Sequence, residues 1–335
     1  MEYTSTNIET VALVVDQPGA DFKLTPVVFD EVCEDEYLIE MKYSGICRTD
    51  LLLQKGLFGG ACSYPAIFGH EGAGIVKKLD PIDKKAAART LDGRSVGAHF
   101  FGQSSFAKLS VVHDQCVVKY PYDDVENIGL YAGAGCGFQT GAGAILNLLK
   151  PKPHQSLVIA GLGAVGLTAL MAAKILGLKT IIVVDIVESK LDLAKELGAT
   201  HAVNSQNTDV LAEVQKQTGR GAAFAIDCTG DPRMIELMIE CIHPFGTAGS
   251  IGDAPAGAKI QIDALKFMVE GKKFLGLVEG DSVPQEFIPK LVSLHKSGEF
   301  PLEKLVSIYS IKDLDQALED MSNGKNVKTV IKWDI

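Results

Sequence analysis

The chain has 335 residues, enough for two domains, and its 47% hydrophobic and 22% charged residues are typical of a soluble globular protein. Its formal net charge of -10 argues against nucleic acid or an anionic membrane surface as the main partner. Residues 1–15 lack the basic start and apolar core of a signal peptide, and no apolar run approaches the roughly 20 residues that span a bilayer. Seven scattered cysteines do not look like a disulfide framework, so we expect a cytoplasmic protein with reduced thiols.

The first third of the chain is typical of short strands. Branched residues bounded by turn formers predict strands at Val11–Val15, Tyr37–Tyr43, Gly74–Lys78 and Leu109–Val118. After Pro151-Lys152-Pro153 the pattern alternates between strands and helices, in the order Leu157–Ala160, Ala164–Leu176, Thr180–Asp185, Glu188–Leu197, Phe224–Cys228, Pro232–Cys241 and Thr247–Ile251. Such alternation predicts parallel βαβ units in a doubly wound sheet.

The last part of the chain returns to a mixed pattern. A strand at Phe274–Val278 is followed by an amphipathic stretch, a last helix and a closing strand, at Gln285–Lys296, Leu314–Met321 and Thr329–Trp333. The parallel sheet therefore interrupts a mostly β domain that is built from both ends of the chain. We place the first part of that domain at residues 1–138, the dinucleotide-binding domain at 139–278 and the return at 279–335.

A glycine-rich turn follows the strand Leu157–Ala160. In Gly161-Leu162-Gly163-Ala164-Val165-Gly166 the pattern GxGxxG opens a helix of small apolar residues, where the third glycine permits close packing. This context predicts the turn on which a dinucleotide pyrophosphate rests. The next strand ends in Asp185, whose carboxylate would bind both ribose hydroxyls and repel a 2′-phosphate, which favours NAD over NADP. The alternative is an acid that only caps the helix at Glu188.

Three short segments carry candidate metal ligands: Cys47-Arg48-Thr49-Asp50, Gly69-His70-Glu71 and Gly135-Cys136-Gly137. Two thiolates and one imidazole are the set that a catalytic zinc uses when its fourth position stays open. Taken singly, the cysteines are also typical of buried small hydrophobes, and the histidine of a core residue. Their glycine-rich and polar surroundings favour zinc. Asp50 or Glu71 would orient His70, so we include Glu71 in the candidate metal site.

With these residues, the chain resembles the zinc-dependent alcohol dehydrogenases of the medium-chain dehydrogenase/reductase superfamily, and within them the aryl- or benzyl-alcohol dehydrogenase branch. The landmarks extend over nearly the whole chain, at residues 45–50, 69–74, 100–106, 135–141 and 279–284. The resemblance implies an α/β fold in which a Rossmann doubly wound parallel sheet is inserted in a mostly β, GroES-like catalytic domain. It also implies a homodimer that pairs through an edge strand at 273–278.

The resemblance assigns roles to individual residues. The zinc ligands would be Cys47, His70 and Cys136, and Thr49 would be the first step of a proton relay. The remaining cofactor contacts would be Arg48 and Lys328 to the pyrophosphate, Asp185 and Lys190 to the adenosine ribose, and Thr140 and Val165 to the nicotinamide. The residues expected to line the substrate pocket are Phe58, Phe100 and Phe101, for which plain core packing is the alternative.

Two departures from the family pattern affect the expected chemistry. The family has a lobe with four closely spaced cysteines, the structural zinc site, between the His70 and Cys136 segments, but this chain has only Cys116 there. We therefore expect one catalytic zinc, no structural zinc and a wider, wetter cleft. The histidine in which the family's relay often ends is replaced by Leu52, so proton release would pass from Thr49 through the ribose hydroxyl to water.

These observations predict a zinc- and NAD-dependent enzyme that interconverts a primary alcohol, aromatic or allylic, and its aldehyde. One alternative is a repurposed medium-chain reductase or a redox-neutral enzyme of specialised metabolism that acts on a larger apolar substrate. Retention of all three zinc ligands argues against it. A second alternative is a catalytically silent binding protein, which predicts no turnover with any alcohol.

Overall fold

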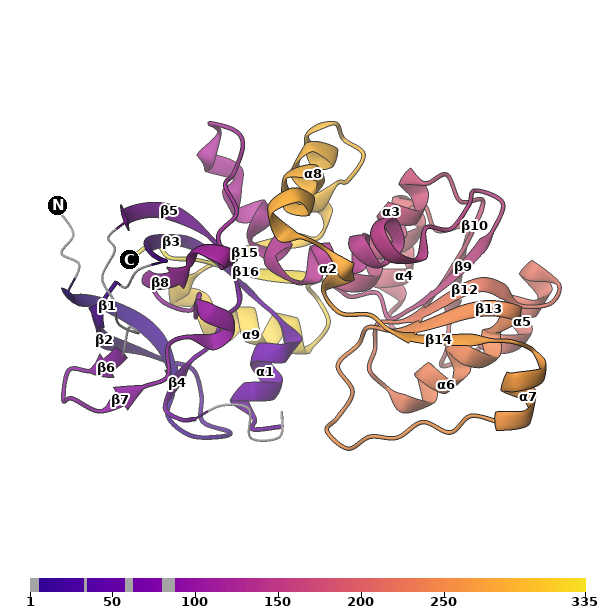
Figure 1. Ribbon diagram of the computed structural model, residues 1–335, viewed down its shortest axis with the longest axis horizontal. Coiled ribbons are helices and arrows are strands. Elements are labelled where there is room, and N and C mark those ends of the chain that lie inside the picture. Colours follow the sequence, from indigo (N-terminus) through magenta and orange to yellow (C-terminus); the bar gives the residue numbers. More distant parts are fainter. Residues whose placement is uncertain (1–5, 33–34, 58–62, 80–87) are drawn as a thin grey trace. The chain divides into compact units, whose positions relative to one another are not determined.

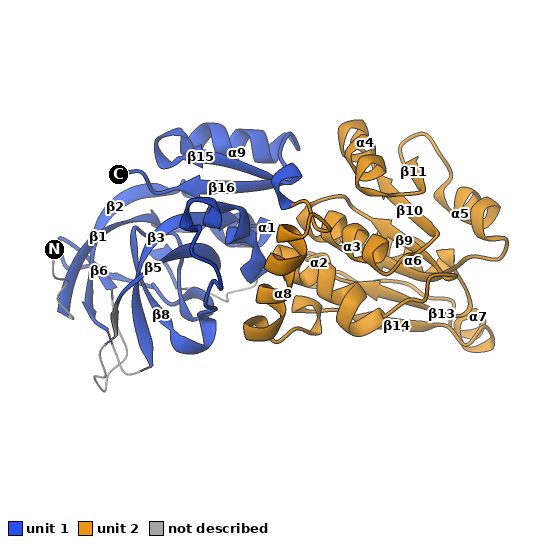
Figure 2. Ribbon diagram, turned by 90° about the horizontal axis from the view of Figure 1, so that it is seen from above, with its two compact units in different colours: residues 1–136, 302–335 blue, residues 137–301 orange. Residues whose placement is uncertain are grey.

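A computed structural model of the chain describes residues 6–32, 35–57, 63–79 and 88–335, and its elements are labelled in Figure 1. The chain forms two compact units, coloured separately in Figure 2: unit 1 contains Met1–Cys136 and Leu302–Ile335, and unit 2 contains Gly137–Pro301. The sequence analysis places domain boundaries after residues 138 and 278. The second of these differs from the structure, in which unit 2 ends at Pro301. The observed boundary lies further along because helix α8 (Pro284–Lys296) packs against helix α2 (Gly137–Gly143) inside unit 2.

Unit 1 is built from two sheets. The first has the order β4-β1-β2-β6-β7, with strands Ala66–Ile67, Thr6–Val15, Lys23–Glu31, Ala88–Thr90 and Ser95–Val96. The second has the order β15-β16-β3-β5, and β8 also pairs with β3; these strands are Val306–Ser310, Lys328–Lys332, Glu36–Ile46, Glu71–Leu79 and Leu109–His113. The α-helices in the described part of this unit are α1 (Arg48–Gln54) and α9 (Leu314–Ser322).

Strand β3 organises the second sheet, since it pairs antiparallel with β5, β8 and β16. In the pairing with β16, Thr329 lies opposite Ile46, the last residue of β3. The final strand of the chain therefore runs beside the point at which β3 leads into Cys47. The core of unit 1 includes the fully buried side chains of Phe29, Phe68 and Phe106.

Unit 2 contains a six-stranded parallel sheet with the order β11-β10-β9-β12-β13-β14. In that order the strands are His201–Asn204, Thr180–Asp185, Ser156–Ala160, Ala222–Asp227, Ile242–Ser250 and Lys273–Gly276. Besides α2 and α8, its α-helices are α3 (Ala164–Ile175), α4 (Glu188–Leu197), α5 (Val210–Thr218), α6 (Pro232–Cys241) and α7 (Ala264–Val269). This combination of a mostly β domain and a Rossmann sheet confirms the predicted fold class.

The central strands of this sheet are apolar because helices cover both of its faces. Figure 1 shows α3 and α4 on one side of the sheet and α5 and α6 on the other. The chain passes from β9 to β10 on one side and later to β12 on the other side of β9. Ligands of such sheets bind at the carboxyl ends of the strands beside this reversal. Among the described residues, no helix has the length and apolar character that a bilayer crossing requires.

Some predicted elements have different bounds in the structure. The strand expected to run to Val118 ends at His113, because a 3-10 turn at Asp114–Cys116 follows it. Strand β13 begins at Ile242, five residues before the predicted Thr247, and its pairing with β12 contains a register shift. Strand β11 and helix α5 had no counterpart in the sequence analysis.

Candidate metal centre and dinucleotide site

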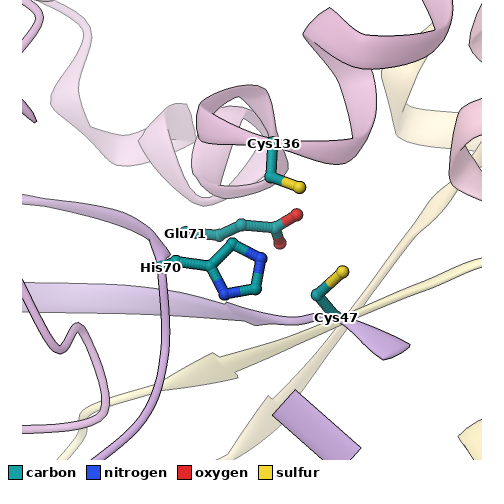
Figure 3. A group of neighbouring side chains, drawn as sticks. All are labelled: Cys47, His70, Glu71 and Cys136. Carbon is teal, nitrogen blue, oxygen red and sulfur yellow. The ribbon is translucent and has the colours of Figure 1, made fainter. Parts of the chain in front are cut away.

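Four side chains from three separate segments of the sequence meet in unit 1, as Figure 3 shows. Ligand atoms of Cys47, His70, Glu71 and Cys136 all lie within 4.8 Å of one another. His70 and Glu71 are buried, and the two cysteines are half-buried. The structure therefore brings together the four residues that the sequence analysis placed at the metal. Two thiols, an imidazole and a carboxylate form a donor set that suits zinc.

Each of these residues stands at the end of a regular element. Cys47 follows β3 directly and is the N-cap of α1, and Glu71 begins β5 opposite Gly45 of β3. A Cβ atom at Gly45 would lie 2.2 Å from Glu71 Oε2, so glycine is needed there to leave room for the carboxylate. Cys136 follows the 3-10 segment Val125–Gly135, which packs against β3 and β5. The pairing of β3 with β5, and the packing of the segment Val125–Gly135 on both strands, thus fix the spacing of the donor atoms.

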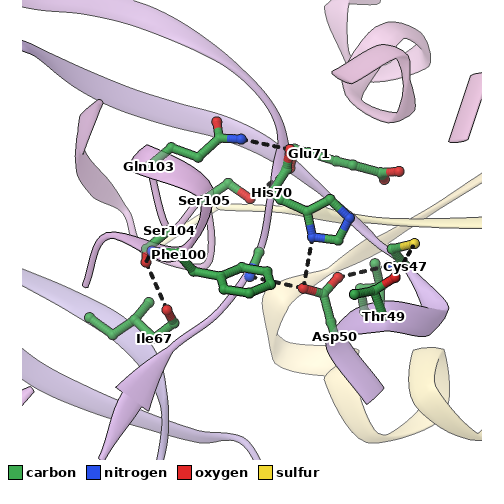
Figure 4. A network of polar contacts seen from close by, with 12 residues as sticks. Cys47, Thr49, Asp50, Ile67, His70, Glu71, Phe100, Gln103, Ser104 and Ser105 are labelled. Atoms are coloured by element: carbon green, nitrogen blue, oxygen red, sulfur yellow. Dashed lines mark hydrogen bonds and ion pairs between the residues drawn. The ribbon is translucent and has the colours of Figure 1, made fainter. Parts of the chain in front are cut away.

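The buried carboxylate of Asp50 connects two of the segments that carry candidate metal ligands (Figure 4). Its Oδ2 accepts a hydrogen bond from the backbone N–H of Cys47 at 2.9 Å, and its Oδ1 accepts one from Gly69 at 3.0 Å. The same Oδ1 lies 3.2 Å from Nδ1 of His70. An imidazole held through Nδ1 presents Nε2 to a metal. Of the two residues considered for orienting His70, Asp50 is the one in contact with its ring nitrogen.

Glu71 has a different partner. Its Oε2 lies 2.5 Å from Nζ of Lys328, and the side chains of both residues are at most 3% exposed. Nζ of Lys328 also donates to the carbonyl oxygen of Ile46 at 3.3 Å. The resemblance implied that Lys328 contacts a pyrophosphate, whereas the structure buries its ammonium group within unit 1, against a residue of the metal-binding group. This ion pair compensates the charge of a carboxylate that has no access to water.

The electrostatics of the group favour a bound cation. Burial opposes a charged imidazole, yet the Asp50 carboxylate raises the pKa of His70 above its ordinary value. A hydrogen bond with Cys136 holds the pKa of the Cys47 thiol well below its ordinary value, against the opposing effect of burial. The thiolate is the form of cysteine that binds a metal, whereas a metal ion must displace the proton of the imidazole in order to bind it.

Two residues of α1 extend the group. Thr49 is half-buried, and its Oγ1 lies 3.7 Å from Sγ of Cys47. Arg48 precedes it and is exposed on unit 1. The structure therefore puts the hydroxyl that is expected to begin a proton relay next to one candidate metal ligand.

Aromatic rings lie against the candidate metal ligand His70. The ring centroids of Phe100 and Phe101 lie 5.6 and 5.5 Å from that of His70. Phe101 is 62% exposed and has a φ of 50°, in the left-handed region that favours glycine. Oγ of Ser104 accepts a hydrogen bond from the backbone N–H of Phe100 at 2.9 Å and so helps to hold this turn. Phe58, the third residue expected in the pocket, lies outside the described residues.

Two supporting side chains had no role in the sequence analysis. Nε2 of Gln103 donates to the carbonyl oxygen of His70 at 2.7 Å, and Oγ of Ser105 donates to that of Glu71 at 2.7 Å (Figure 4). Both belong to the landmark segment 100–106, but neither is a residue type that binds metal in the predicted pattern. Only the fold shows that this segment supports the backbone between two candidate ligands.

Replacing Asp50 with asparagine is expected to weaken zinc binding about 10- to 100-fold, because the neutral amide no longer supports the basicity and orientation of His70. Competition with a chelator, followed by mass-spectrometric metal analysis, measures this change. Asp16→Asn is the matched control, since Asp16 pairs with Arg94 at the exposed surface of the same unit. Equal zinc affinity in the two variants would contradict the role assigned to Asp50.

The glycine-rich turn lies in unit 2, at the carboxyl end of β9. Gly161 has a φ of +89°, and a Cβ atom at Gly166 would lie 1.9 Å from the carbonyl oxygen of Gly161. At Gly163 a Cβ atom would meet nothing within 4 Å. The turn is thus closed on its protein side and open where a pyrophosphate would approach the backbone. Helix α3 begins within this segment, at Ala164, and Val165 is half-buried in its first turn.

Asp185 lies next to this turn, at the end of β10. Its Oδ2 accepts a hydrogen bond from the backbone N–H of Leu162 at 2.6 Å, and its Oδ1 accepts bonds from Ile186 and Val187 at 2.8 and 3.0 Å. The carboxylate is therefore fixed beside the glycines, where the adenosine ribose lies in folds of this kind. Lys190 is half-buried in the first turn of α4.

Thr140 is a buried residue of helix α2. Its Oγ1 lies 3.4 Å from Oε2 of Glu279, and Nε2 of Gln139 donates to the same oxygen at 3.0 Å. A Cβ atom at Gly141 would lie 1.9 Å from the carbonyl oxygen of Val165, so α2 packs closely on the start of α3. The two residues expected to contact a nicotinamide, Thr140 and Val165, thus belong to one tightly packed helix pair.

Comparison with protein families and relatives follows the division of the chain. Residues 33–122 match the family model described as alcohol dehydrogenase GroES-like domain, and residues 164–297 match the one described as zinc-binding dehydrogenase. A geraniol dehydrogenase from Castellaniella defragrans is 32% identical over 376 aligned residues, which cover 99% of this chain and 100% of that protein.

Two solved structures are similar in both fold and sequence. One is an alcohol dehydrogenase zinc-binding domain protein from Burkholderia ambifaria, with a TM-score of 0.90 and 34% identity over 98% of this chain and 99% of that chain. The other is a benzyl alcohol dehydrogenase from Acinetobacter calcoaceticus, with a TM-score of 0.88 and 34% identity over 97% of this chain and 99% of that chain.

Proposed function

We propose a reaction for this chain, which belongs to the zinc-dependent alcohol dehydrogenases of the medium-chain dehydrogenase/reductase superfamily. It interconverts a primary alcohol and its aldehyde, and the alcohol is aromatic or allylic. The observation that carries the proposal is the group of Cys47, His70, Glu71 and Cys136, with ligand atoms within 4.8 Å of one another in a member of this family.

The substrate class rests on the relatives and on the aromatic residues beside His70. Geraniol and benzyl alcohol appear in the names of two of the relatives. Both carry their hydroxyl on a saturated carbon that is bonded to an unsaturated carbon. The exposed ring of Phe101 and the ring of Phe100 offer flat apolar surfaces at the metal-binding group. Such surfaces favour a flat unsaturated substrate by apolar and aromatic contact.

Cys47, His70 and Cys136 would hold zinc, and Glu71 completes the donor set on its buried side. Zinc bound there supplies Lewis-acid chemistry that lowers the pKa of an alcohol hydroxyl. Asp50 keeps the ring of His70 oriented through Nδ1, and Lys328 balances the charge of Glu71. These two contacts hold the donors in position before substrate arrives.

Thr49 would take up the proton that the alcohol hydroxyl releases. Its Oγ1 accepts that proton while its own hydroxyl proton passes onward, so the side chain is regenerated. Leu52, half-buried on the same helix, has no polar atom with which to extend this route. Proton release would therefore be slower than in relatives that have a histidine at this position.

NAD would bind to unit 2, where it supplies the acceptor for the hydride that leaves the substrate carbon. Gly161, Gly163 and Gly166 would form the backbone cradle for its pyrophosphate, and Asp185 would accept hydrogen bonds from the ribose and disfavour NADP. Three further contacts would come from Lys190, Thr140 and Val165. The exposed guanidinium of Arg48 on unit 1 would add a contact to the pyrophosphate.

A single zinc per chain is part of the proposal. Among the residues that the structure describes, Cys47, His70, Glu71 and Cys136 form the one group of this composition. The alignment with the geraniol dehydrogenase extends over 376 residues, more than the 335 of this chain, so it passes over positions that this chain lacks. We assign the difference to the lobe of the structural zinc.

The proposal also includes a cytoplasmic homodimer. β14 is the outer strand of its sheet, and the apolar side chains of Leu265, Met268, Val269 and Val278, which precede or follow it in the sequence, are exposed. An outer strand offers unpaired backbone groups to a second copy. Sedimentation equilibrium tests the assembly, and a mass of one chain would contradict it.

The cytoplasmic location is supported by the cysteines. Free thiols at the five described cysteines are typical of a reducing compartment.

The experiment that tests the function combines metal analysis with turnover. Purified protein is expected to contain one zinc per chain and to reduce NAD+ with benzyl alcohol and geraniol faster than with ethanol. NADP+ in the same assay is expected to give the lower kcat/KM. Protein that binds NAD+ but contains no zinc and oxidises none of these alcohols would refute the proposal and favour a repurposed enzyme.

A further inference from the structure

Three consecutive residues of unit 2 have left-handed backbone conformations. The φ angles of Glu279, Gly280 and Asp281 are 48°, 62° and 50°. Only the middle residue is a glycine, so two side chains are held in a conformation that L residues rarely adopt. Such strain persists only where the surrounding structure imposes it, and it is common at functional sites.

The surrounding structure that imposes this conformation is helix α2. A Cβ atom at Gly280 would lie 2.5 Å from the carbonyl oxygen of Gln139 and 2.7 Å from Cα of Gly143. A Cβ atom at Gly143 would in turn lie 2.4 Å from the carbonyl oxygen of Gly280, which also accepts a hydrogen bond from Asn147 at 3.3 Å. The turn therefore docks backbone to backbone on the helix, and both glycines are needed.

This docking directs the carboxylate of Glu279 onto Thr140. Oε2 of Glu279 lies 3.4 Å from Oγ1 of Thr140 and accepts a hydrogen bond from Gln139 at 3.0 Å. Gln139 and Thr140 are 2% and 7% exposed, whereas Glu279 is exposed. The structure thus places the carboxylate of an exposed residue against the residue that we assign to the nicotinamide.

We propose that Glu279 sets the preference of the enzyme between the oxidised and the reduced cofactor. The nicotinamide ring is a cation in NAD+ and neutral in NADH, while the rest of the two molecules is the same. A carboxylate held at Thr140 attracts the cationic ring and adds nothing comparable for the neutral one. Glu279 also positions the Thr140 hydroxyl. This inference rests on the proposed function, because that function puts the nicotinamide at Thr140.

The test compares the affinity of both cofactors for the zinc-loaded wild-type protein and for Glu279→Gln. Calorimetry gives the Kd of NAD+, and fluorescence enhancement gives the Kd of NADH. We expect Glu279→Gln to weaken NAD+ binding about five- to tenfold at low ionic strength and to change NADH binding less than about twofold. Asp281→Asn removes the same charge two residues away, in the same left-handed turn, and is expected to leave the ratio of the two Kd values unchanged.

A second measurement needs no variant. Raising sodium chloride from about 20 mM to about 500 mM should weaken the binding of both cofactors through their phosphates, and the binding of NAD+ more. The wild-type ratio of the NAD+ Kd to the NADH Kd should therefore rise. Equal losses of affinity for NAD+ and NADH in Glu279→Gln would leave the ratio of their Kd values unchanged. That result would overturn the inference while leaving the proposed function intact. Failure of the wild-type protein to bind either cofactor would refute the proposed function itself.

Discussion

Replacing Cys47 with alanine is expected to remove zinc from the protein and to lower kcat/KM for benzyl alcohol at least about 10³-fold. Cys47 supplies one of two sulfur donors, and the hydrogen bond from its backbone N–H to Asp50 places it at the start of α1. Alanine preserves that backbone contact and removes only the donor atom. Metal analysis by mass spectrometry and a steady-state assay on the same preparation measure the two effects together.

Cys116→Ala is the matched control for this variant. Cys116 is an exposed cysteine of unit 1 outside the four-residue group, so its loss should leave one zinc per chain. Binding of NAD(H) should survive in Cys47→Ala, because the glycine turn and Asp185 belong to unit 2. Full activity in a zinc-free Cys47→Ala protein would remove the metal from the mechanism.

Replacing Gly166 with alanine is expected to destabilise the protein by about 3 kcal/mol and to weaken NAD+ binding at least about 100-fold. Its Cβ atom would stand 1.9 Å from the carbonyl oxygen of Gly161, which is a backbone atom and cannot turn away. Helix α3 would have to shift away from the turn, and its N-terminus is the part of the helix that we propose faces the pyrophosphate. Thermal unfolding and calorimetric titration with NAD+ measure the two losses.

Gly163→Ala separates the two effects. Its Cβ atom would meet nothing within 4 Å, and its φ of -79° is ordinary for any residue. Its melting temperature should therefore match that of the wild type. NAD+ binding should still weaken, because the methyl group would occupy the open side of the turn. A Gly166→Ala protein with wild-type stability and affinity would show that α3 does not depend on this close approach.

Local patterns predicted the elements that carry the cofactor site. The apolar run of β9, the glycines that follow it and the acid at the end of β10 are close in sequence, so their spacing alone implied a shared location. The residues Cys47, His70 and Cys136 were also predicted from local context. Strand β11 was missed, since four residues with mixed polarity give little periodic signal. Helix α5, with nine residues, was also missed.

Contacts between distant segments were not predictable in this way. The pair of Glu71 and Lys328 joins residues 257 positions apart, and only the register of β16 on β3 brings them together. The sequence left Asp50 and Glu71 as alternatives for holding His70, because both are acids close to a ligand. Deciding between them required side-chain directions that depend on how α1 begins and how β5 pairs.

The position of Lys328 on β16 also constrains the order in which the protein can mature during synthesis. Ribosomes release the chain from its N-terminus, so Cys47, His70 and Cys136 all emerge long before residue 328. Until β16 pairs with β3, the Glu71 carboxylate lacks its buried counter-charge, and burying it alone is strongly unfavourable. Unit 2, complete at Pro301, can fold first. The glycine-rich turn and Asp185 can thus reach their folded arrangement before the surroundings of Glu71 are complete.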